Sequence, residues 1–274
     1  MLKQRIITAI ILVVLFLIAV FFSSPAIWSL IALLVVGQGA VEWARLSNLH
    51  GRAATAYWAL ALMLMLLTLW FDLNVDAKQQ SLNHLPWYGA AVLLWVLVVP
   101  AWLIAGWRPR NVLVMGAVGW VVLIPTALAL IDLRAITPWL LLAVMSTVWV
   151  ADIAAYFSGR RFGKRKLAPS ISPGKTWEGV FGALILVSIY VIALVWATGY
   201  IKQFITYPGV IVAVWWWVGL SVIGDLFESA VKRQAGVKDS GALLPGHGGL
   251  LDRIDALTAT LPFAAITLVF ERWS

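Results

Sequence analysis

The chain has 274 residues, of which 62% are hydrophobic and only 12% are charged. A soluble domain carries about one-quarter charged residues, so this composition excludes a water-soluble globular protein and predicts an all-α integral membrane protein. The sequence contains no cysteine, which excludes disulfides, a thiolate nucleophile and a cysteine zinc site. In a membrane protein a net charge of +8 reflects basic residues that set the orientation of the spans and attract anionic lipids or substrates. We therefore expect no nucleic acid partner.

Nine apolar segments are predicted to cross the membrane, since a span needs roughly 20 apolar residues. The first follows Lys3 and Arg5, is long for a signal peptide and lacks a cleavage pattern, so we expect it to be retained. Prolines, including Pro86, mark predicted boundaries. The predicted spans are about 6–23, 26–45, 54–72, 87–106, 111–131, 137–158, 178–199, 208–230 and 250–270.

The distribution of Lys and Arg predicts the orientation of these spans. With a cytoplasmic N-terminus and alternating spans, every Lys and Arg lies on the cytoplasmic side except Lys78, Arg134, Lys202 and Arg272. This positive-inside bias supports both the orientation and the number of spans. It places the C-terminus on the opposite side of the membrane.

Ionisable residues divide the chain into two regions. Residues 1–135 are predicted to form a scaffold of about five helices with few ionisable groups inside the spans. Residues 136–274 are predicted to form a catalytic region of about four helices with two cytoplasmic loops. Here carboxylates enter the spans, at Asp152, Glu178, Asp225, Glu228, Asp252 and Asp255. Such groups are costly in hydrocarbon unless they face a cavity, a partner charge or a metal.

The first polar motif is WVADIAAYFSGRRFGKRKLAPSISPGKTWEG at residues 149–179. Asp152 and Tyr156 share one helix face, and the helix is predicted to end near Gly163, before a loop. A Gly-Lys-Thr sequence at a helix start can hold phosphate through backbone amides and a lysine, although the spacing differs from a Walker A loop. The Arg and Lys run of this motif is also compatible with contact to lipid headgroups.

A second motif, GDLFESAVKR at residues 224–233, makes a polar stripe on an otherwise apolar span. Asp225, then Glu228 or Ser229, and then Lys232 lie on one helix face. An intrahelical Asp–Lys ladder could be purely structural, but its desolvation inside a membrane is costly. We therefore favour a functional role for this stripe.

A third motif, KDSGALLPGHGGLLDRID at residues 238–255, combines a glycine-dense loop with two aspartates at the start of the last span. Glycine allows the backbone to approach a ligand closely. A helix N-terminus favours one acidic residue, but it does not explain the convergence of Asp252 and Asp255 with Asp225 and Asp239. Such oxygen ligands suit Mg²⁺ rather than zinc, whereas His247 alone is a weak candidate.

Carboxylates that hold a divalent ion beside clustered Lys and Arg are what phosphoryl or nucleotidyl transfer requires. The metal bridges phosphate oxygens, and the cations neutralise the charge that builds on leaving pyrophosphate. A cytoplasmic site at the membrane gives access to both a nucleoside triphosphate and a lipid.

The run from Ser229 to Asp255, SAVKRQAGVKDSGALLPGHGGLLDRID, resembles the signature of the phosphatidate cytidylyltransferase family, or CDP-diacylglycerol synthases. The block that ends at Gly179 is also similar to this family, whereas the N-terminal half matches only as generic spans. The resemblance implies that CTP reacts with phosphatidic acid to give CDP-diacylglycerol and pyrophosphate, in phospholipid biosynthesis. It also implies dependence on Mg²⁺, with K⁺ as a candidate second ion, and often a homodimer. We expect a multi-pass protein of a bacterial inner membrane with a cytoplasmic site.

The motifs and the resemblance together assign roles to individual residues. The metal-ligand candidates are Asp225 and Asp252, followed by Asp239 and Asp255. The predicted catalytic residues are Asp225, Lys232, Arg233, Lys238, Asp239, Asp252 and Arg253. Substrate phosphate is expected at Ser172, Lys175, Thr176, Ser229, His247, Gly248 and Gly249, with supporting roles for Asp152, Tyr156, Glu178 and Glu228. Whether residues 172–176 hold phosphate of CTP or of the lipid stays open.

Three alternatives compete with this hypothesis. One is a different membrane phosphotransferase that uses a CDP-alcohol or a polyprenyl phosphate; the CDP-alcohol type requires a DGxxAR…GxxxDxxxD spacing, which this sequence lacks. An ion-coupled membrane transporter also uses intramembrane carboxylates, but here the charges gather at one predicted face and no clear internal repeat is present. An inactive relative that serves as a partner subunit is disfavoured by the complete motif.

Overall fold

The computed structural model describes residues 2–199, 207–243 and 248–273, which form nine helical segments and one β-hairpin. Seven of these segments are long and apolar enough to cross a membrane, which confirms the predicted helical membrane protein. The crossing by the first and last segments stays a prediction. The helices are α1 (Leu2–Phe22), α2 (Pro25–Leu46), α3 (Gly51–Phe71), the continuous segment of α4 (Ala77–Leu93), η1 (Leu94–Val98) and α5 (Val99–Ala105), α6 (Val112–Ile136), α7 (Pro138–Phe162), α8 (Trp177–Thr198), α9 (Tyr207–Gln234) and α10 (Leu251–Trp273).

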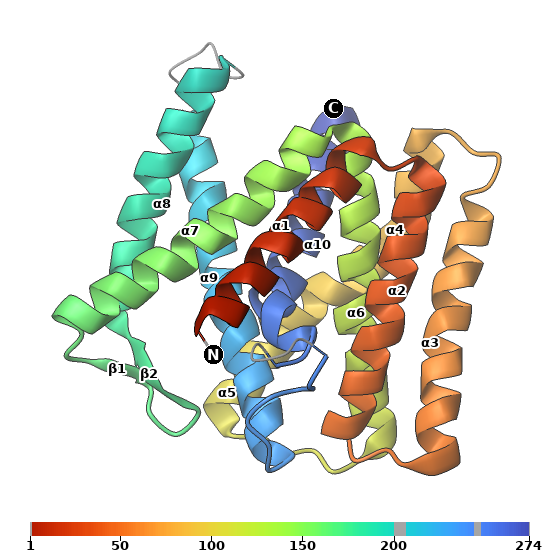
Figure 1. Ribbon diagram of the computed structural model, residues 1–274, viewed down its shortest axis with the longest axis horizontal. Helices are drawn as coiled ribbons and strands as arrows, with labels where there is room; N and C mark the ends of the chain where they lie inside the picture. Colours follow the sequence, from red (N-terminus) through yellow and green to blue (C-terminus); the bar gives the residue numbers. More distant parts are fainter. Residues whose placement is uncertain (1, 200–206, 244–247, 274) are drawn as a thin grey trace.

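Successive helices run in opposite directions, so their connections alternate between two ends of the molecule (Figure 1). Helices α2, α3, α4 and α6 form an upright group on one side, and α7, α8 and α9 form a group on the other. Helix α10 packs against both α9 and α6. The β-hairpin, the α2–α3 connection and the link from α9 to α10 lie at the same end, which we call the hairpin end.

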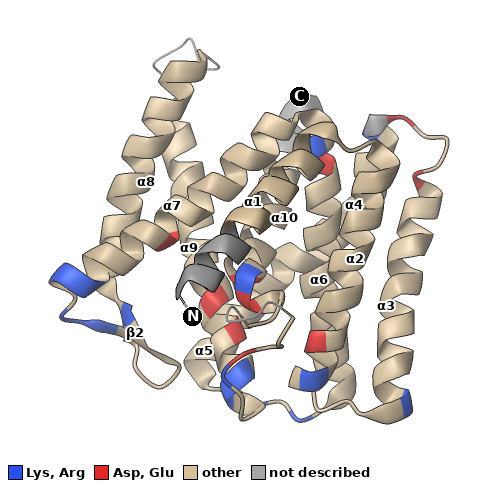
Figure 2. Ribbon diagram, viewed as in Figure 1, with Lys and Arg blue, Asp and Glu red and all other residues tan. Residues whose placement is uncertain are grey.

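Basic residues are concentrated at the hairpin end. Figure 2 shows most of the Lys and Arg positions there and few at the opposite end. The charge separation that the sequence predicted is therefore present in the fold. The orientation of the two ends relative to the cytoplasm stays a prediction.

The fourth span begins earlier than the predicted residues 87–106. Asp76 caps α4 by accepting a hydrogen bond from the Gln79 N–H at 2.8 Å, and the helix continues through Pro86. The prediction of Pro86 as a boundary was wrong. Prolines are tolerated in membrane helices, because neighbouring helices and local π-helical or 3₁₀ turns satisfy the freed backbone groups.

The segment predicted as a loop after Gly163 instead contains a β-hairpin. Strand β1 (Lys166–Ala168) pairs antiparallel with β2 (Ser172–Thr176). Pro173 lies within β2, which is compatible with a two-stranded sheet because both of its strands are edges. The hairpin leads directly into α8 and so fixes how the Gly-Lys-Thr sequence enters that helix.

An aromatic cluster around Phe227 holds α9 against the first half of the chain. Phe227 is 1% exposed, and its ring centroid lies 6.2, 5.5 and 5.3 Å from those of Trp43, Trp95 and Trp102. These three rings come from α2, η1 and α5. One hydrophobic core therefore includes helices from both predicted regions, and the proposed division near residue 135 stays a prediction.

Candidate active site

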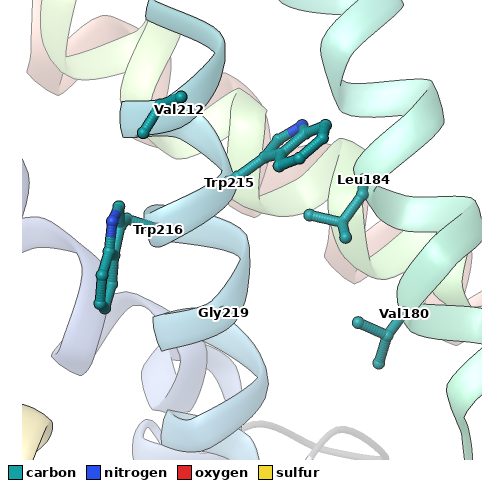
Figure 3. Close-up of a pocket in the computed structure, with 6 residues that line it drawn as sticks. All are labelled: Val180, Leu184, Val212, Trp215, Trp216 and Gly219. Atoms are coloured by element: carbon teal, nitrogen blue, oxygen red, sulfur yellow. The ribbon is translucent and has the colours of Figure 1, made fainter. Parts of the chain in front are cut away.

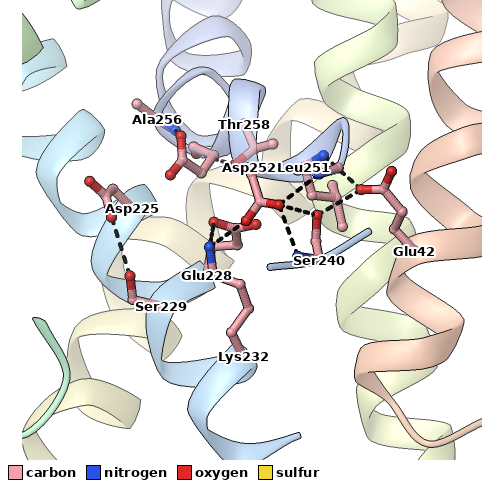
Figure 4. A network of polar contacts seen from close by, with 12 residues as sticks. Glu42, Asp225, Glu228, Ser229, Lys232, Ser240, Leu251, Asp252, Ala256 and Thr258 are labelled. Carbon is pink, nitrogen blue, oxygen red and sulfur yellow. Dashed lines mark hydrogen bonds and ion pairs between the residues drawn. The ribbon is translucent and has the colours of Figure 1, made fainter. Parts of the chain in front are cut away.

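Lys232 joins two carboxylates at the hairpin ends of α9 and α10 (Figure 4). Its Nζ lies 2.8 Å from Glu228 Oε2 and 2.6 Å from Asp252 Oδ1. Glu228 lies one helical turn before Lys232, so both side chains project from the same face of α9. Asp252 comes from the first turn of α10. All three side chains are largely buried, so removal of Lys232 would leave two carboxylates without their counter-charge.

The second oxygen of Asp252 is held by the link between α9 and α10. Asp252 Oδ2 accepts hydrogen bonds from the Ser240 N–H and Ser240 Oγ, each at 2.9 Å, and from the Gly249 N–H at 2.8 Å. Both carboxylate oxygens are therefore engaged by protein groups. The role of Asp252 as a metal ligand stays a prediction.

Glu42 on α2 is a site residue that the sequence analysis missed. It is 1% exposed and accepts hydrogen bonds from the Leu250 N–H at 2.8 Å and the Leu251 N–H at 2.9 Å. It also shares the single proton of the Ser240 hydroxyl, whose Oγ lies 2.8 Å away, with Asp252. Unpaired N–H groups at a helix start favour a carboxylate. Glu42 therefore caps α10 and connects to Asp252 through Ser240. Its only sequence signal was a carboxylate near the end of an apolar span, 208 positions before Leu250.

Glycines allow these backbones to approach closely. A Cβ on Gly249 would overlap Ser240 Oγ, and Gly248 has a φ of 81°, which favours glycine. A Cβ on Gly224 would lie 2.6 Å from the carbonyl oxygen of Asp255, so this glycine lets α9 approach α10. The close backbone approach thus serves contacts within the protein, and phosphate binding by Gly248 and Gly249 stays a prediction.

A second polar cluster surrounds Asp225. Lys175 Nζ lies 2.7 Å from Asp225 Oδ2, and Ser229 Oγ donates a hydrogen bond to Asp225 Oδ1 at 3.3 Å. Asp152 on α7 and Asp255 on α10 lie close enough to Asp225 for their charges to repel it. The Asp225 side chain is 34% exposed. This cluster is therefore open and contains more carboxylates than lysines.

The β-hairpin positions Lys175 beside α9. Thr176 Oγ1 caps α8 by accepting a hydrogen bond from the Gly179 N–H at 3.2 Å. Because Thr176 is fixed in this way, the preceding residue on β2 can reach across to α9. Lys175 Nζ also lies 3.5 Å from the carbonyl oxygen of Val222. The Thr176 hydroxyl serves as a helix cap here, and its predicted phosphate contact stays a prediction.

Glu178 fastens the start of the hairpin to α8. Its carboxylate accepts hydrogen bonds from the Lys164 N–H at 3.0 Å and the Arg165 N–H at 3.2 Å. Glu178 thus lies at the base of the basic hairpin, and its supporting role in the site stays a prediction. Ser172 lies at the beginning of β2 and is partly buried.

Several predicted residues lie outside both clusters. Tyr156 is exposed, and its hydroxyl accepts a hydrogen bond from Arg160 at 3.1 Å. His247 lies outside the described residues. Arg233, Lys238, Asp239 and Arg253 are exposed at the hairpin end. Their catalytic roles stay predictions.

Comparison with known proteins identifies the family. Residues 3–270 match the model of the cytidylyltransferase family. The chain belongs to this family. A phosphatidate cytidylyltransferase from Pseudomonas aeruginosa is 40% identical over 286 residues, which cover 100% of this chain and 99% of the relative. A phosphatidate cytidylyltransferase from Haemophilus influenzae is 38% identical over 283 residues, which cover 96% of this chain and 97% of the relative.

Membership of the cytidylyltransferase family confirms the resemblance found in residues 149–255 and extends it to the N-terminal helices. A shorter match, to a phosphatidate cytidylyltransferase from Thermotoga maritima, is 40% identical over 133 residues and covers 46% of this chain and 47% of the relative. The family is one of nucleotidyl-transferring enzymes, which supports an enzyme and not the alternative of an ion-coupled transporter.

The carboxylates of this cytidylyltransferase family member suit a Mg²⁺ ion that is bound jointly by protein and substrate. Among the described residues, no three His, Cys, Asp or Glu side chains are placed to hold a metal ion together. Mg²⁺ is commonly held by one or two carboxylates, with waters and substrate phosphates as the other ligands. Asp225 and Asp255 suit that arrangement, and the nearby Glu228 Oε1 is buried without a hydrogen-bond partner in the described part of the chain. The site therefore fits an ion shared with substrate.

Proposed function

We propose that the chain transfers the cytidylyl group of CTP to phosphatidic acid, giving CDP-diacylglycerol and pyrophosphate. The observation that carries this proposal is the open cluster of Asp152, Asp225, Asp255 and Lys175 at the basic end of the membrane helices. Two relatives that match nearly the whole chain are named phosphatidate cytidylyltransferases. A membrane lipid and a soluble nucleotide can both reach a cluster in this position.

We assign Lys175 to a phosphate oxygen of the substrate. Its side chain is 23% exposed, and its pairing with Asp225 leaves it accessible to an incoming phosphate. A lysine provides a compact charge and three donors, which suits a phosphate group that gains negative charge as pyrophosphate leaves. The proposed nucleophile is the phosphate oxygen of phosphatidic acid, which is already anionic near neutral pH and requires no strong general base.

Asp225 and Asp255 are the residues that we propose to hold Mg²⁺, with Asp152 adding negative potential beside them. When bound, the ion neutralises charge on the reacting phosphates and aligns them. Asp239 and Asp252 are further ligand candidates, and K⁺ is a candidate second ion. Arg233, Lys238 and Arg253, exposed at the same end, are proposed to attract the triphosphate.

The buried network of Glu42, Lys232 and Asp252 has a different proposed role. It ties α2, α9 and α10 together directly beside Asp225 and Asp255. Catalysis requires reacting groups to be held within fractions of an ångström, and a misplacement of about 1 Å can reduce the rate about 10²-fold. We propose that this network positions the open cluster.

We further propose that the hairpin end faces the cytoplasm of a bacterial inner membrane. The excess of Lys and Arg at this end supports that orientation, and CTP would then reach the site directly. A homodimer stays a prediction from the resemblance.

The test of this function is pyrophosphate release by the purified protein in detergent, given CTP, phosphatidic acid and Mg²⁺. We expect release to require all three components and to yield one CDP-diacylglycerol for each pyrophosphate. Asp76→Asn is the control for a general loss of negative charge, because Asp76 lies at the opposite end and only caps α4. Folded wild-type protein without release in several detergents and in lipid nanodiscs would overturn the proposal.

A further inference from the structure

An apolar groove lies between α8 and α9 (Figure 3). Lys175, which precedes α8, and Asp225, which follows the groove residues on α9, pair at the hairpin end of these two helices. Its volume is about 330 Å³, which falls within the range of about 300–1,000 Å³ typical of ligand sites. The groove is lined by Val180 and Leu184 from α8 and by Val212, Trp215, Trp216 and Gly219 from α9.

The protein bridges the two walls of the groove at two levels. Trp215 reaches from α9 toward Leu184, and its Nε1 donates a hydrogen bond to Ser188 Oγ on α8 at 2.8 Å. At the hairpin end, Lys175 crosses from β2 to α9 and pairs with Asp225. The groove therefore has an aromatic end toward the membrane centre and a charged end at the candidate active site.

Gly219 lies between these two bridges. It is six positions before Asp225 on α9, which corresponds to about 9 Å along the helix. A Cβ on Gly219 would meet nothing within 4 Å, so the wall is open at this point. Trp215 and Trp216 are 48% and 59% exposed, so the groove is accessible from the side.

We infer that this groove holds one acyl chain of phosphatidic acid while the phosphate of the same molecule reaches Lys175. The inference rests on the proposed function and adds to it a binding place for the lipid. A molecule with an apolar chain at one end and a phosphate at the other matches the apolar lining and the adjacent lysine. Bulk lipid or a second copy of the chain would match the apolar lining alone.

Moving an acyl chain from the bilayer into the groove gains little hydrophobic free energy, because lipid tails in a bilayer are already in apolar surroundings. The groove instead orients the lipid. A chain held between α8 and α9 restricts where the phosphate can lie relative to Asp225. The predicted effect of blocking the groove is therefore on kcat/KM for long-chain phosphatidic acid. The KM for CTP is expected to stay unchanged.

Gly219→Leu tests the inference because the new side chain would project into open space in the groove. The matched control is Gly209→Leu, on the same helix, where a Cβ also meets nothing within 4 Å and which does not line the groove. Replacement of a helical glycine by leucine favours the helix, so neither variant is expected to unfold. We expect Gly219→Leu to lower kcat/KM for dioleoyl phosphatidic acid on the order of tenfold and to leave dihexanoyl phosphatidic acid unaffected.

A second measurement detects occupancy without turnover. The chain has no cysteine, so Gly219→Cys introduces a single thiol at the groove. We expect dioleoyl phosphatidic acid to slow alkylation of this thiol by a maleimide several-fold relative to dioleoyl phosphatidylcholine at the same mole fraction. The thiol of Gly209→Cys should react at the same rate in both lipids.

The outcomes distinguish failure of the inference about the groove from failure of the proposed function. One outcome is that wild-type protein is active, that kcat/KM of Gly219→Leu depends on acyl-chain length as in the wild type, and that both lipids slow alkylation of Gly219→Cys equally. Bulk lipid then fills the groove, and the inference is wrong. If Gly219→Leu instead changes the oligomeric state, the groove is an interface between copies and the inference is also wrong. Inactive wild-type protein would overturn the proposed function, whereas the alkylation result would still decide whether phosphatidic acid occupies the groove.

Discussion

The two polar clusters at the hairpin end differ in how exposed their carboxylates are and in how firmly backbone N–H groups hold them. In the network of Glu42, Ser240 and Asp252, both carboxylates are buried, and each accepts two hydrogen bonds from backbone N–H groups. Around Asp225, carboxylates from three helices lie near one another, and the Asp225 side chain is 34% exposed. A closed network holds helices in place, whereas an open excess of negative charge is suited to cations and the phosphates they bind.

The largest expected effect comes from Asp225→Asn. This change keeps the shape of the side chain but removes the charge at the centre of the open cluster. We expect pyrophosphate release to fall on the order of 10³-fold, because stabilisation of the transition state by a bound ion amounts to several kcal/mol. The thermal unfolding temperature should change little, since the cluster loses a repelling charge. A variant with near wild-type turnover would remove Asp225 from the site.

A somewhat smaller effect is expected for Lys175→Met, which keeps the length of the apolar stem. Loss of one phosphate-stabilising group should lower kcat/KM about 10²-fold. Kinetics at varied CTP and varied phosphatidic acid would show which KM rises, and so which substrate phosphate Lys175 contacts. Lys175→Arg should recover part of the activity, because it retains the charge. Unchanged kinetics in Lys175→Met would mean that the lysine only balances Asp225.

The smallest effect on catalytic activity is expected for Glu42→Gln, which tests the buried network of Glu42, Ser240 and Asp252. The neutral amide cannot accept all the hydrogen bonds from Ser240, Leu250 and Leu251, so we expect a stability loss of about 1–3 kcal/mol. Thermal unfolding in detergent measures this change, and activity should fall less than tenfold at a temperature where the variant is folded. Gln38→Leu is the control, since it removes only the contact of Gln38 with Glu42 at 2.8 Å. A loss of activity as large as that of Asp225→Asn would show that Glu42 belongs to the chemical site.

Much of the fold followed from the sequence because apolar runs of about 20 residues leave few alternatives to membrane helices. The polar stripe from Asp225 to Lys232 was also visible, since helical periodicity alone places those side chains on one face. The β-hairpin was not predicted, because its strands are short, Pro173 lies within β2 and Pro169 directly follows β1. The passage of α4 through Pro86 depends on tertiary packing that no local pattern reports.

The contacts between site residues were harder to predict than the identity of those residues. Lys175 and Asp225 were both candidate residues, but their pairing depends on how β2 meets α9. Glu42 escaped prediction because its role appears only when α2 is placed beside the start of α10. A local pattern identifies polar residues that are costly to bury in a membrane, whereas the fold determines which of them form hydrogen bonds or ion pairs with one another.

The most direct test of the contrast between the closed and open clusters is binding of Mn²⁺, measured by electron paramagnetic resonance on the purified protein with CTP. Mn²⁺ shares the preference of Mg²⁺ for oxygen ligands. We predict that Asp225→Asn and Asp255→Asn lose protein-bound Mn²⁺, and that Glu42→Gln retains it with wild-type affinity. Loss of Mn²⁺ binding in Glu42→Gln together with retention in Asp225→Asn would contradict the account.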